Sequence, residues 1–82
     1  MKLVYFASLR ERLGMGEELV DLPPEVHTVA DVIAFLSARD EIYEAAFATG
    51  TARAALDKKH AKLNAPIAGA AEIAFFPPMT GG

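Results

Sequence analysis

The sequence predicts a small α+β domain in which one long helix packs on a short-stranded sheet. Two runs rich in β-forming residues stand near the ends of the chain, at residues 3–7 and 72–76. Between them, four apolar residues recur at the spacing of one helix face: Val29, Val32, Ile33 and Leu36. Prolines and glycines punctuate the rest of the chain, so the remaining elements must be short.

The N-terminal part is expected to form a strand, a short helix and a second strand. Ser8 is placed to cap a helix over residues 9–13, and Gly14 is placed to end it. Residues 17–22 alternate weakly as the second strand, which we expect to pair antiparallel with the first. The proline pair at 23–24 stops this pairing, because proline has no N–H to donate to a neighbouring strand.

The long helix has the clearest start in the chain. Thr28 and Asp31 have the spacing of a capping box, in which each side chain binds the other residue's backbone N–H. We expect the helix to run from there to about Arg39. A second helical stretch follows at residues 41–48, and Gly50 is a plausible end for it.

The C-terminal part is expected to contain three short strands. Two of them are predicted at residues 54–57 and 61–63, with a polar turn between them. The last strand is predicted at residues 72–76, with Ile73 and Phe75 facing the helix. A sheet built from these strands and the N-terminal pair would cover one face of the long helix.

Length and composition favour one globular domain and exclude several classes of function. The chain has 82 residues, of which 52% are hydrophobic and 23% are charged. Its net charge of −3 is the opposite of that expected for a nucleic-acid-binding protein. It has no cysteine, which excludes disulfides and a cysteine nucleophile. The apolar run near Met1 is too short for a signal peptide or a membrane span, so we expect a cytoplasmic protein.

No constellation of side chains predicts an active site or a metal site within the chain. His27 and His60 are far apart in sequence, and neither has a second ligand at metal-binding spacing. Ser8 has no evident base, which argues against nucleophilic catalysis. Residues 14–16 lack the pattern of a phosphate-binding loop. We therefore expect no bound metal or cofactor.

The C-terminus is the candidate for chemistry. Gly81 and Gly82 give a slender end whose carboxylate is open to attack, because neither residue carries a side chain. The stiff pair Pro77-Pro78 marks the exit, so we expect a folded domain over residues 1–78 and a flexible tail over residues 79–82. Activation of the carboxylate by ATP would give an acyl-adenylate, from which a sulfur donor would form a thiocarboxylate.

The ends of the sequence resemble one known family. Residues 72–82 read EIAFFPPMTGG, an ending similar to that of the small, sulfur-carrier subunits of molybdopterin synthase. The opening at residues 4–11 and the helix start at residues 28–31 resemble the same family. The likeness extends over the whole chain at matching length. It departs at residues 68–72 and at Asp57, which is asparagine in many members, and both departures lie in turn or edge regions away from the tail.

The resemblance implies a ubiquitin-like β-grasp fold and a carrier that is not an enzyme on its own. An E1-like adenylyltransferase would consume ATP to adenylate Gly82, and a sulfur donor system would then convert it to the thiocarboxylate. Gly81 would keep the approach narrow. The tail would enter the large, catalytic subunit and donate sulfur to cyclic pyranopterin monophosphate in molybdenum cofactor biosynthesis, in a heterotetramer of two small and two large subunits.

Alternation along the strands predicts a docking surface beside the tail. Phe6 and Phe76 would face outward from the first and last strands, and they would meet near the exit if these strands are parallel neighbours. Two exposed aromatic residues there suit a partner surface, and the alternative is that a loop covers Phe6 or Phe76. The expected partner-binding residues are therefore Phe6, Phe76, Pro77, Pro78, Met79 and Thr80.

Three other functions are compatible with the same ending. The first is a sulfur carrier for another pathway, such as thiazole synthesis, whose carriers are usually shorter and lack the Phe-Phe-Pro-Pro approach. The second is a protein modifier that is conjugated through Gly82 to lysines of other proteins, because an acyl-adenylate reacts with amines. The simplest alternative is an interaction domain with an inert tail.

Overall fold

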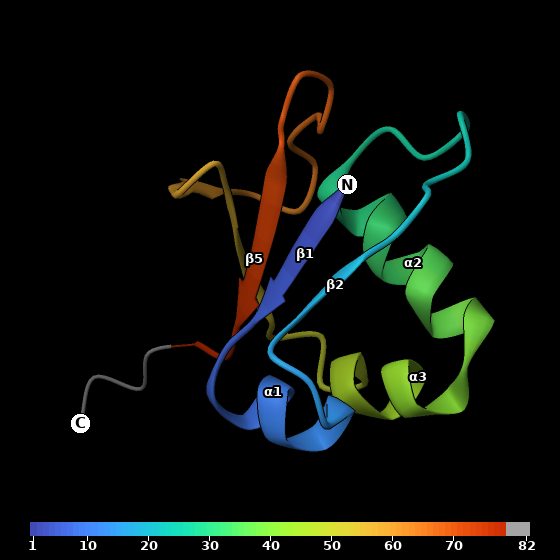
Figure 1. The fold of residues 1–82 in the computed structure, drawn as a ribbon, viewed down its shortest axis with the longest axis vertical. Coiled ribbons are helices and arrows are strands. Elements are labelled where there is room, and N and C mark those ends of the chain that lie inside the picture. The colour runs from blue at the N-terminus through green and yellow to red at the C-terminus, as the bar shows by residue number, and fades with distance from the viewer. Residues whose placement is uncertain (79–82) are drawn as a thin grey trace.

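The structure is a computed structural model that describes residues 1–78. Within that range the chain forms five strands and three helices, which Figure 1 shows from the blue N-terminus to the red C-terminal strand. The elements are β1 (Lys2–Tyr5), α1 (Ala7–Leu13), β2 (Glu17–Leu19), α2 (Val29–Arg39), α3 (Glu41–Phe47), β3 (Arg53–Leu56), β4 (Lys59–Ala61) and β5 (Glu72–Phe76). This is the α+β class that the sequence predicts.

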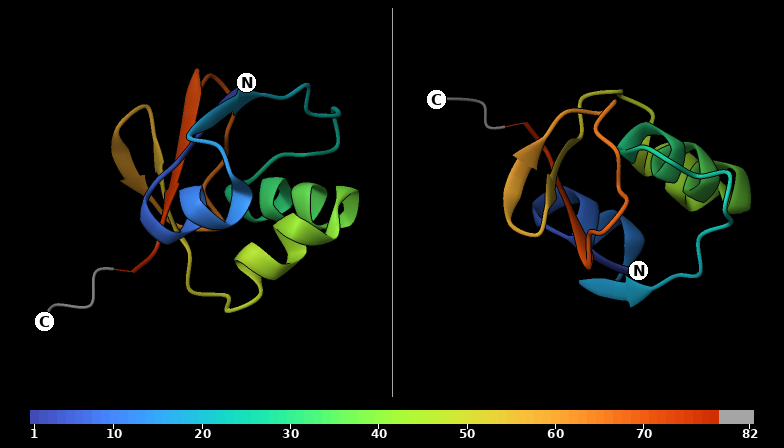
Figure 2. Two further views of the ribbon diagram at one scale, coloured as in Figure 1. Left: turned by 60° about the horizontal axis from the view of Figure 1, so that its bottom comes forward. Right: turned by 90° about the horizontal axis from the view of Figure 1, so that it is seen from above.

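The five strands form one mixed sheet in the order β2-β1-β5-β3-β4. β1 pairs antiparallel with β2, as expected, and parallel with β5. β3 pairs antiparallel with both β5 and β4. Figure 2 shows α2 and α3 against one face of this sheet, with α1 at one end. The other face, called the outer face below, has no described helix over it.

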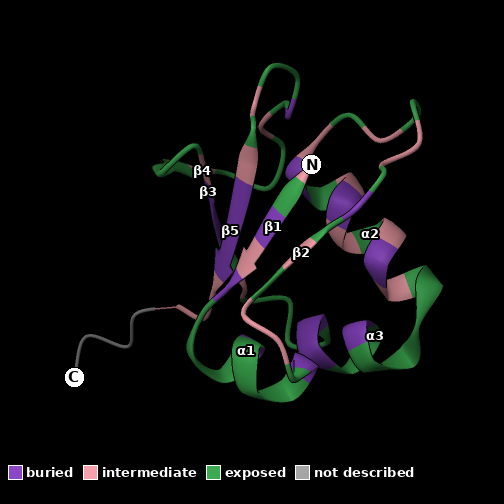
Figure 3. Cartoon of the chain, in the orientation of Figure 1, coloured by how far each residue is buried: buried purple, intermediate pink, exposed green. Residues whose placement is uncertain are grey.

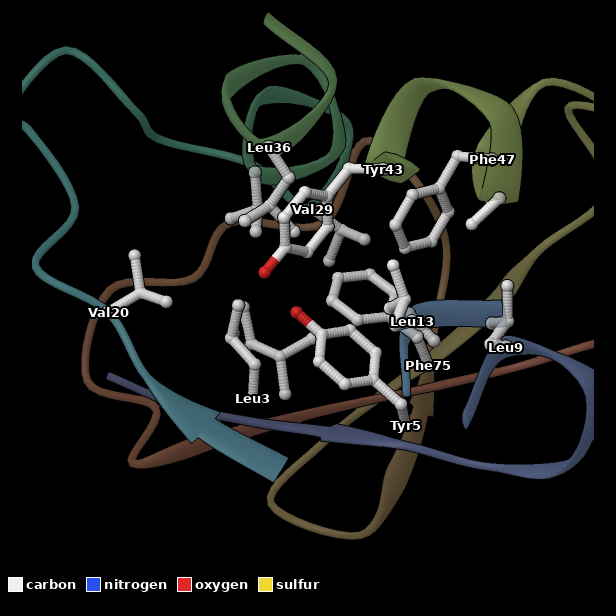
Figure 4. Packing of buried hydrophobic residues seen from close by; sticks show 14 of the residues in the cluster. Leu3, Tyr5, Leu9, Leu13, Val20, Val29, Leu36, Tyr43, Phe47 and Phe75 are labelled. Carbon is white, nitrogen blue, oxygen red and sulfur yellow. The ribbon is translucent and has the colours of Figure 1, made fainter. Parts of the chain in front are cut away.

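The core lies between the sheet and the helices. From the two central strands it receives the fully buried side chains of Leu3, Tyr5, Ile73 and Phe75. The ring of Phe75 stacks on Tyr5 with centroids 6.1 Å apart and meets Phe47 edge-on at 5.3 Å. Figure 3 shows this buried stripe along β1 and β5, and Figure 4 shows the side chains that fill it. Burying each large apolar side chain stabilises the fold by about 1.5–3 kcal/mol.

The capping box predicted for the long helix is present. The Thr28 hydroxyl accepts the Asp31 backbone N–H at 3.1 Å, and an Asp31 carboxylate oxygen accepts the Thr28 backbone N–H at 3.1 Å. The helix runs to Arg39, and Val29, Val32 and Leu36 are fully buried on its inner face. The periodicity of the sequence therefore identified both the start and the buried face of α2.

The predicted start of the short helix was wrong. α1 begins at Ala7, so Ser8 lies inside the helix, and the N-cap residue is Phe6, whose side chain makes no capping hydrogen bond. The cause is a sharp change of direction at Ala7, whose φ of 51° is unusual for a residue with a side chain. The predicted end was correct, because Gly14 takes the left-handed conformation with φ 72°.

The strands of the C-terminal hairpin are shifted from the predicted positions. β4 covers Lys59–Ala61, not residues 61–63, and β3 begins and ends one residue earlier than expected. Asp57 and Lys58 both have positive φ values, of 47° and 71°, and form a two-residue turn. A tight turn pairs Leu56 directly with Lys59, which moves polar residues into the strand. Similarly, β2 ends at Leu19 and β1 at Tyr5, two or more residues before their expected ends.

Candidate functional site

The segment that leads to the tail follows the end of β5, the central strand of the sheet. β5 pairs with β1 up to Phe75 and with β3 up to Phe76. Pro77 and Pro78 follow, and both are partly buried. Figure 1 shows the chain departing there, near the start of α1. The predicted reactive residues and their neighbours lie outside the described residues: Met79, Thr80, Gly81 and Gly82.

The structure places Phe6 and Phe76 at this same end of the sheet. β1 and β5 are parallel and in register, with Tyr5 opposite Phe75. The Phe6 backbone N–H then donates to the Phe75 carbonyl oxygen at 3.0 Å, which carries the pairing one residue further. Phe6 is 49% exposed, whereas Phe76 is partly buried. The two strands therefore end together, as parallel pairing requires, with an exposed aromatic residue at the end of β1.

Part of the Phe76 ring is covered by His60, for which the sequence indicated only that it has no second ligand at metal-binding spacing. The two rings meet edge-on with centroids 5.4 Å apart. His60 lies on β4, two strands away from β5 in the sheet. The two-residue turn sets this register, and the sequence signal for that turn is weak because neither Asp57 nor Lys58 is glycine. The candidate docking surface is therefore Phe6, Phe76 and His60.

The outer face grades from charged at one end to aromatic at the tail end. At the charged end the Lys2 ammonium lies 3.2 Å from a Glu17 carboxylate oxygen and 3.8 Å from one of Glu72. The register then places Val4 beside Ala74, and Phe6 follows at the exit. The outward residues of both strands thus begin charged and end aromatic, which is the pattern that alternation predicts.

A polar cluster under β2 ties the sheet to the helices. A Glu18 carboxylate oxygen accepts hydrogen bonds from the hydroxyls of Tyr5, at 2.8 Å, and Tyr43. The Arg39 guanidinium donates to the other Glu18 oxygen at 3.2 Å and to the Tyr43 hydroxyl at 2.9 Å. Figure 4 shows the two tyrosine hydroxyls directed to the same place. These bonds join β1, β2, α2 and α3 at one point.

The environment of this cluster shifts the pKa values of its members. Burial raises the pKa of Tyr5 well above its ordinary value, and the hydrogen bond to Glu18 raises it further. Burial also acts to raise the pKa of Glu18, but hydrogen bonds from Tyr43, Tyr5 and Arg39 outweigh it and leave that pKa below its ordinary value. Near neutral pH the cluster is a carboxylate held by two neutral phenols and a guanidinium. The sequence offered no signal for it, because Glu18 reads as an ordinary strand residue.

The start of β5 is held by the turn between β3 and β4. One Asp57 carboxylate oxygen accepts the backbone N–H groups of Ala71 and Glu72, at 3.0 and 3.1 Å. The Asp57 N–H donates in return to the Glu72 carbonyl oxygen at 3.0 Å. Asparagine has the same acceptor oxygen, so the departure from the resembled family at Asp57 does not disturb this contact. The strand that carries the tail is therefore fixed at both its ends.

The described residues bring no other reactive groups together. Within residues 1–78, no three His, Asp or Glu side chains are grouped so as to hold a metal ion. The two histidines lie on different parts of the fold, because His27 precedes the N-cap of α2 and His60 is on β4. None of the helices described is long and apolar enough to cross a membrane.

Comparison with known proteins gives matches along the whole chain. The sequence profile described as the ThiS family matches residues 3–82. The molybdopterin synthase sulfur carrier subunit of Escherichia coli (strain K12) is 28% identical over 82 residues, which cover 100% of this chain and 99% of that protein.

Solved structures of similar size share the fold. The crystal structure of SAMP1 from Haloferax volcanii matches with a TM-score of 0.72 and 25% identity, covering 100% of this chain and 98% of that one. A putative molybdopterin converting factor, subunit 1, from Pyrococcus furiosus matches with a TM-score of 0.72 and 24% identity, covering 95% of each chain. The ubiquitin-like β-grasp fold implied by the resemblance is confirmed.

Proposed function

Because this chain belongs to the ThiS family, whose members are ubiquitin-like, non-catalytic sulfur carriers, we propose that it is the sulfur carrier subunit of a molybdopterin synthase. The observation that carries the proposal is the full-length match to the sulfur carrier subunit of Escherichia coli. The sequence of the tail and its exit, FFPPMTGG, supports it, because the last strand ends where the sequence places a slender, glycine-tipped end.

The chemistry takes place on the Gly82 carboxylate. Its oxygen attacks the α-phosphorus of ATP, which forms the glycyl adenylate and releases pyrophosphate. The outer sulfur of a persulfide on the donor system then attacks the carbonyl carbon and AMP leaves, which forms an acyl disulfide. A second thiol of the donor system attacks this disulfide, which releases the thiocarboxylate and leaves a disulfide on the donor. Gly81 and Gly82 have no side chains to obstruct either attack.

The thiocarboxylate sulfur is the group that is delivered. It attacks an oxygen-bearing carbon of cyclic pyranopterin monophosphate, so a C–S bond forms as the C–O bond at that carbon breaks and the oxygen departs as phosphate ester or water. Hydrolysis of the acyl–sulfur bond then leaves the sulfur on the pterin and restores the carboxylate of the carrier. The product dithiolene contains two sulfur atoms, so two loaded carriers are consumed per pterin. The pterin-binding and catalytic groups are assigned to the large subunit, and two small and two large subunits form the proposed assembly.

The outer face beside the exit is the proposed surface for these partners. Phe6 is half exposed there, and the rings of Phe76 on β5 and His60 on β4 lie against each other, although β3 separates the two strands. Pro77 and Pro78 continue from this surface into the tail, with Met79 and Thr80 as the next proposed contacts. An aromatic patch beside an inserted chain end is the composition expected of the centre of a protein interface.

A second function has a specific observation in its favour. SAMP1 of Haloferax volcanii has the same fold at 25% identity over the whole of this chain, and a further structure of it is described as small archaeal modifier protein 1. Conjugation through Gly82 to lysine side chains uses the same adenylate, with an amine in place of sulfur. A sulfur carrier for thiazole synthesis is the remaining alternative within the family.

Reconstitution of the last step separates these functions. The carrier, loaded as the thiocarboxylate, is mixed with the large synthase subunit and cyclic pyranopterin monophosphate, and dithiolene formation is followed by fluorescence of the oxidised pterin. We expect product in proportion to the loaded carrier, and none from a chain extended by one alanine after Gly82. Failure with a competent control carrier, together with higher-mass conjugates on a blot of the cells, would favour the modifier function.

A further inference from the structure

Two hollows flank the point where the tail leaves the domain. The first, of about 140 Å³, is formed by α1, the end of α3 and the loop after it, and its lining includes Ser8, Arg12, Thr49 and Pro78. The second, of about 430 Å³, lies over β3 and β4, and its lining includes Arg53, Lys62 and again Pro78. Pro78 is therefore bordered on two sides by surface depressions that contain cationic side chains.

These cations are available to a partner. Within residues 1–78 the ion pairs are those of Lys2 and Arg39. Arg12, Arg53 and Lys62 are exposed and take part in none of them. None of the three is held by the polar cluster around Glu18. No described carboxylate therefore forms an ion pair with any of the three side chains.

The charges of the chain are strongly segregated. Residues 17–44 contain eight of the eleven acidic residues and only one basic residue, Arg39. The basic residues gather in α1 and in the segment from Arg53 to Lys62, which includes β3 and β4. Of these basic residues, Arg12, Arg53 and Lys62 line the hollows beside Pro78, so the overall charge of −3 conceals a positive region at the tail exit. Such a region attracts a surface of opposite sign and accelerates its approach.

We propose that Arg12, Arg53 and Lys62 form a cationic collar that docks on carboxylates around the mouth of the adenylating enzyme's channel. The inference rests on the proposed function, which requires that enzyme to take in the tail. The four residues after Pro78 span at most about 14 Å when fully extended. To reach the Gly82 carboxylate, the mouth of the channel must come within that distance of Pro78, and its rim then faces the collar.

The collar and the aromatic surface have different roles in this docking. Phe6 and Phe76 supply apolar contact area, whereas exposed charges at a rim chiefly raise the association rate and select the partner. Attraction between exposed charges is screened over about 8 Å at physiological ionic strength. The collar's contribution is consequently large at low salt and small at high salt.

Steady-state kinetics with the adenylating enzyme tests the collar. Three variants reverse its charges: Arg12→Glu, Arg53→Glu and Lys62→Glu. Each should raise the KM for the carrier about three- to tenfold at low salt, with kcat nearly unchanged, because exposed ion pairs are individually weak and reversal adds repulsion. The triple variant should also lose most of the salt dependence of kcat/KM. Thermal unfolding of each variant verifies that the domain is intact.

A matched control changes the charge equally at the other end of the sheet. Lys58 lies in the β3–β4 turn next to Asp57, which binds the start of β5, so Lys58→Glu alters net charge without altering the collar. Its KM should stay within about twofold of the parent, since distant exposed charges are screened. A rise equal to that of the collar variants would show that only net charge matters and would overturn the proposal.

The two proposals fail in different ways. If the parent chain is adenylated and the collar variants match it in KM and salt dependence, the collar is refuted and the carrier function stands. If an active adenylating enzyme does not adenylate the parent chain, the carrier function is refuted, and the collar with it. Recovery of KM when a rim carboxylate of the enzyme is changed to lysine in combination with Arg12→Glu would be the direct support.

Discussion

The Phe6 backbone N–H donates to the Phe75 carbonyl oxygen at 3.0 Å, one residue beyond the end of β1. This bond keeps the two parallel strands together up to the residue before Phe76. Beyond this bond the two strands separate, because α1 follows β1 and Pro77 follows β5. The exposed ring of Phe6 and the base of the tail are therefore held in a fixed relation, so that a partner receiving the tail meets Phe6 as well.

Substitution of the exposed aromatic residue should separate docking from folding. Phe6→Asp removes a ring that is 49% exposed and introduces a carboxylate at the N-cap of α1, where no side chain caps the helix now. We expect the free energy of unfolding to stay within about 0.5 kcal/mol of the parent. Affinity for the large subunit should fall by about 2 kcal/mol or more, as at an interface hot spot. Titration calorimetry and thermal unfolding measure the two effects.

Leu19→Asp is the control for Phe6→Asp. Leu19 is 82% exposed on β2, and its register partner Lys2 lies at the opposite end of β1 from the tail. Its loss should leave affinity unchanged. Phe76→Asp should also weaken binding more than it lowers the free energy of unfolding. Its effect on folding should be larger than that of Phe6→Asp, because it also removes the contact with His60. Unaltered binding by both phenylalanine variants would remove this surface from the interface.

The hydrogen bonds that the Asp57 carboxylate accepts at the start of β5 predict a contribution to stability. Asp57→Ala leaves the backbone N–H groups of Ala71 and Glu72 without their acceptor and places alanine at positive φ. We expect a loss of about 1–2 kcal/mol in the free energy of unfolding, measured by urea denaturation. Asp57→Asn keeps an acceptor oxygen and tolerates the backbone conformation, so it should cost less than about 0.5 kcal/mol. Equal losses for the two variants would contradict this role.

The Glu18 cluster predicts an acid-sensitive contribution to stability. The pKa of Glu18 is lower in the folded protein than its ordinary value of 4.5, so the folded state binds fewer protons. This contribution is fully present above pH 4.5 and is lost as the pH falls through the folded-state pKa. Glu18→Gln should lower the free energy of unfolding by about 1–3 kcal/mol at neutral pH. In this variant the free energy of unfolding should also fall less steeply as the pH decreases below 4.5. An unchanged profile of urea midpoints against pH would refute it.

Two hydroxyl residues distinguish a true helix cap from a false one. Thr28→Ala removes the acceptor that binds the Asp31 N–H and should cost about 1 kcal/mol. Ser8→Ala should have almost no effect, because Ser8 is an exposed residue inside α1 and Phe6 occupies the N-cap. Thermal unfolding of both variants under one condition makes the comparison. A larger loss for Ser8→Ala would mean that α1 starts where the sequence predicts.

The sequence predicted those parts of the fold that local chemistry determines. The α2 cap depends on two residues three positions apart, and the final strand is bounded by Pro77, so both were located correctly. Alternation likewise placed Ile73 and Phe75 in the core. The predicted start of α1 was wrong because the true start depends on the positive φ of Ala7. A sequence predicts positive φ at glycine and not at alanine.

The sequence alone shows the residue types of the proposed site but not how the fold groups them. The glycine tip, its proline exit and the outward phenylalanines are visible in the sequence. The contact of His60 with Phe76 is not, because it depends on a hairpin register set by a turn without glycine. The grouping of Arg12 with Arg53 around Pro78 joins residues that are 41 positions apart, which only the fold brings together.

The central claim is that the Gly82 carboxylate is the reactive group, and intact mass spectrometry tests it most directly. The purified chain is incubated with the adenylating enzyme, ATP and a sulfur donor, and a C-terminal peptide is then fragmented. We predict a mass gain equal to the exchange of one oxygen for sulfur, located on Gly82 and absent when one alanine follows it. An unmodified Gly82, in a reaction where a control carrier is fully converted, would contradict the account.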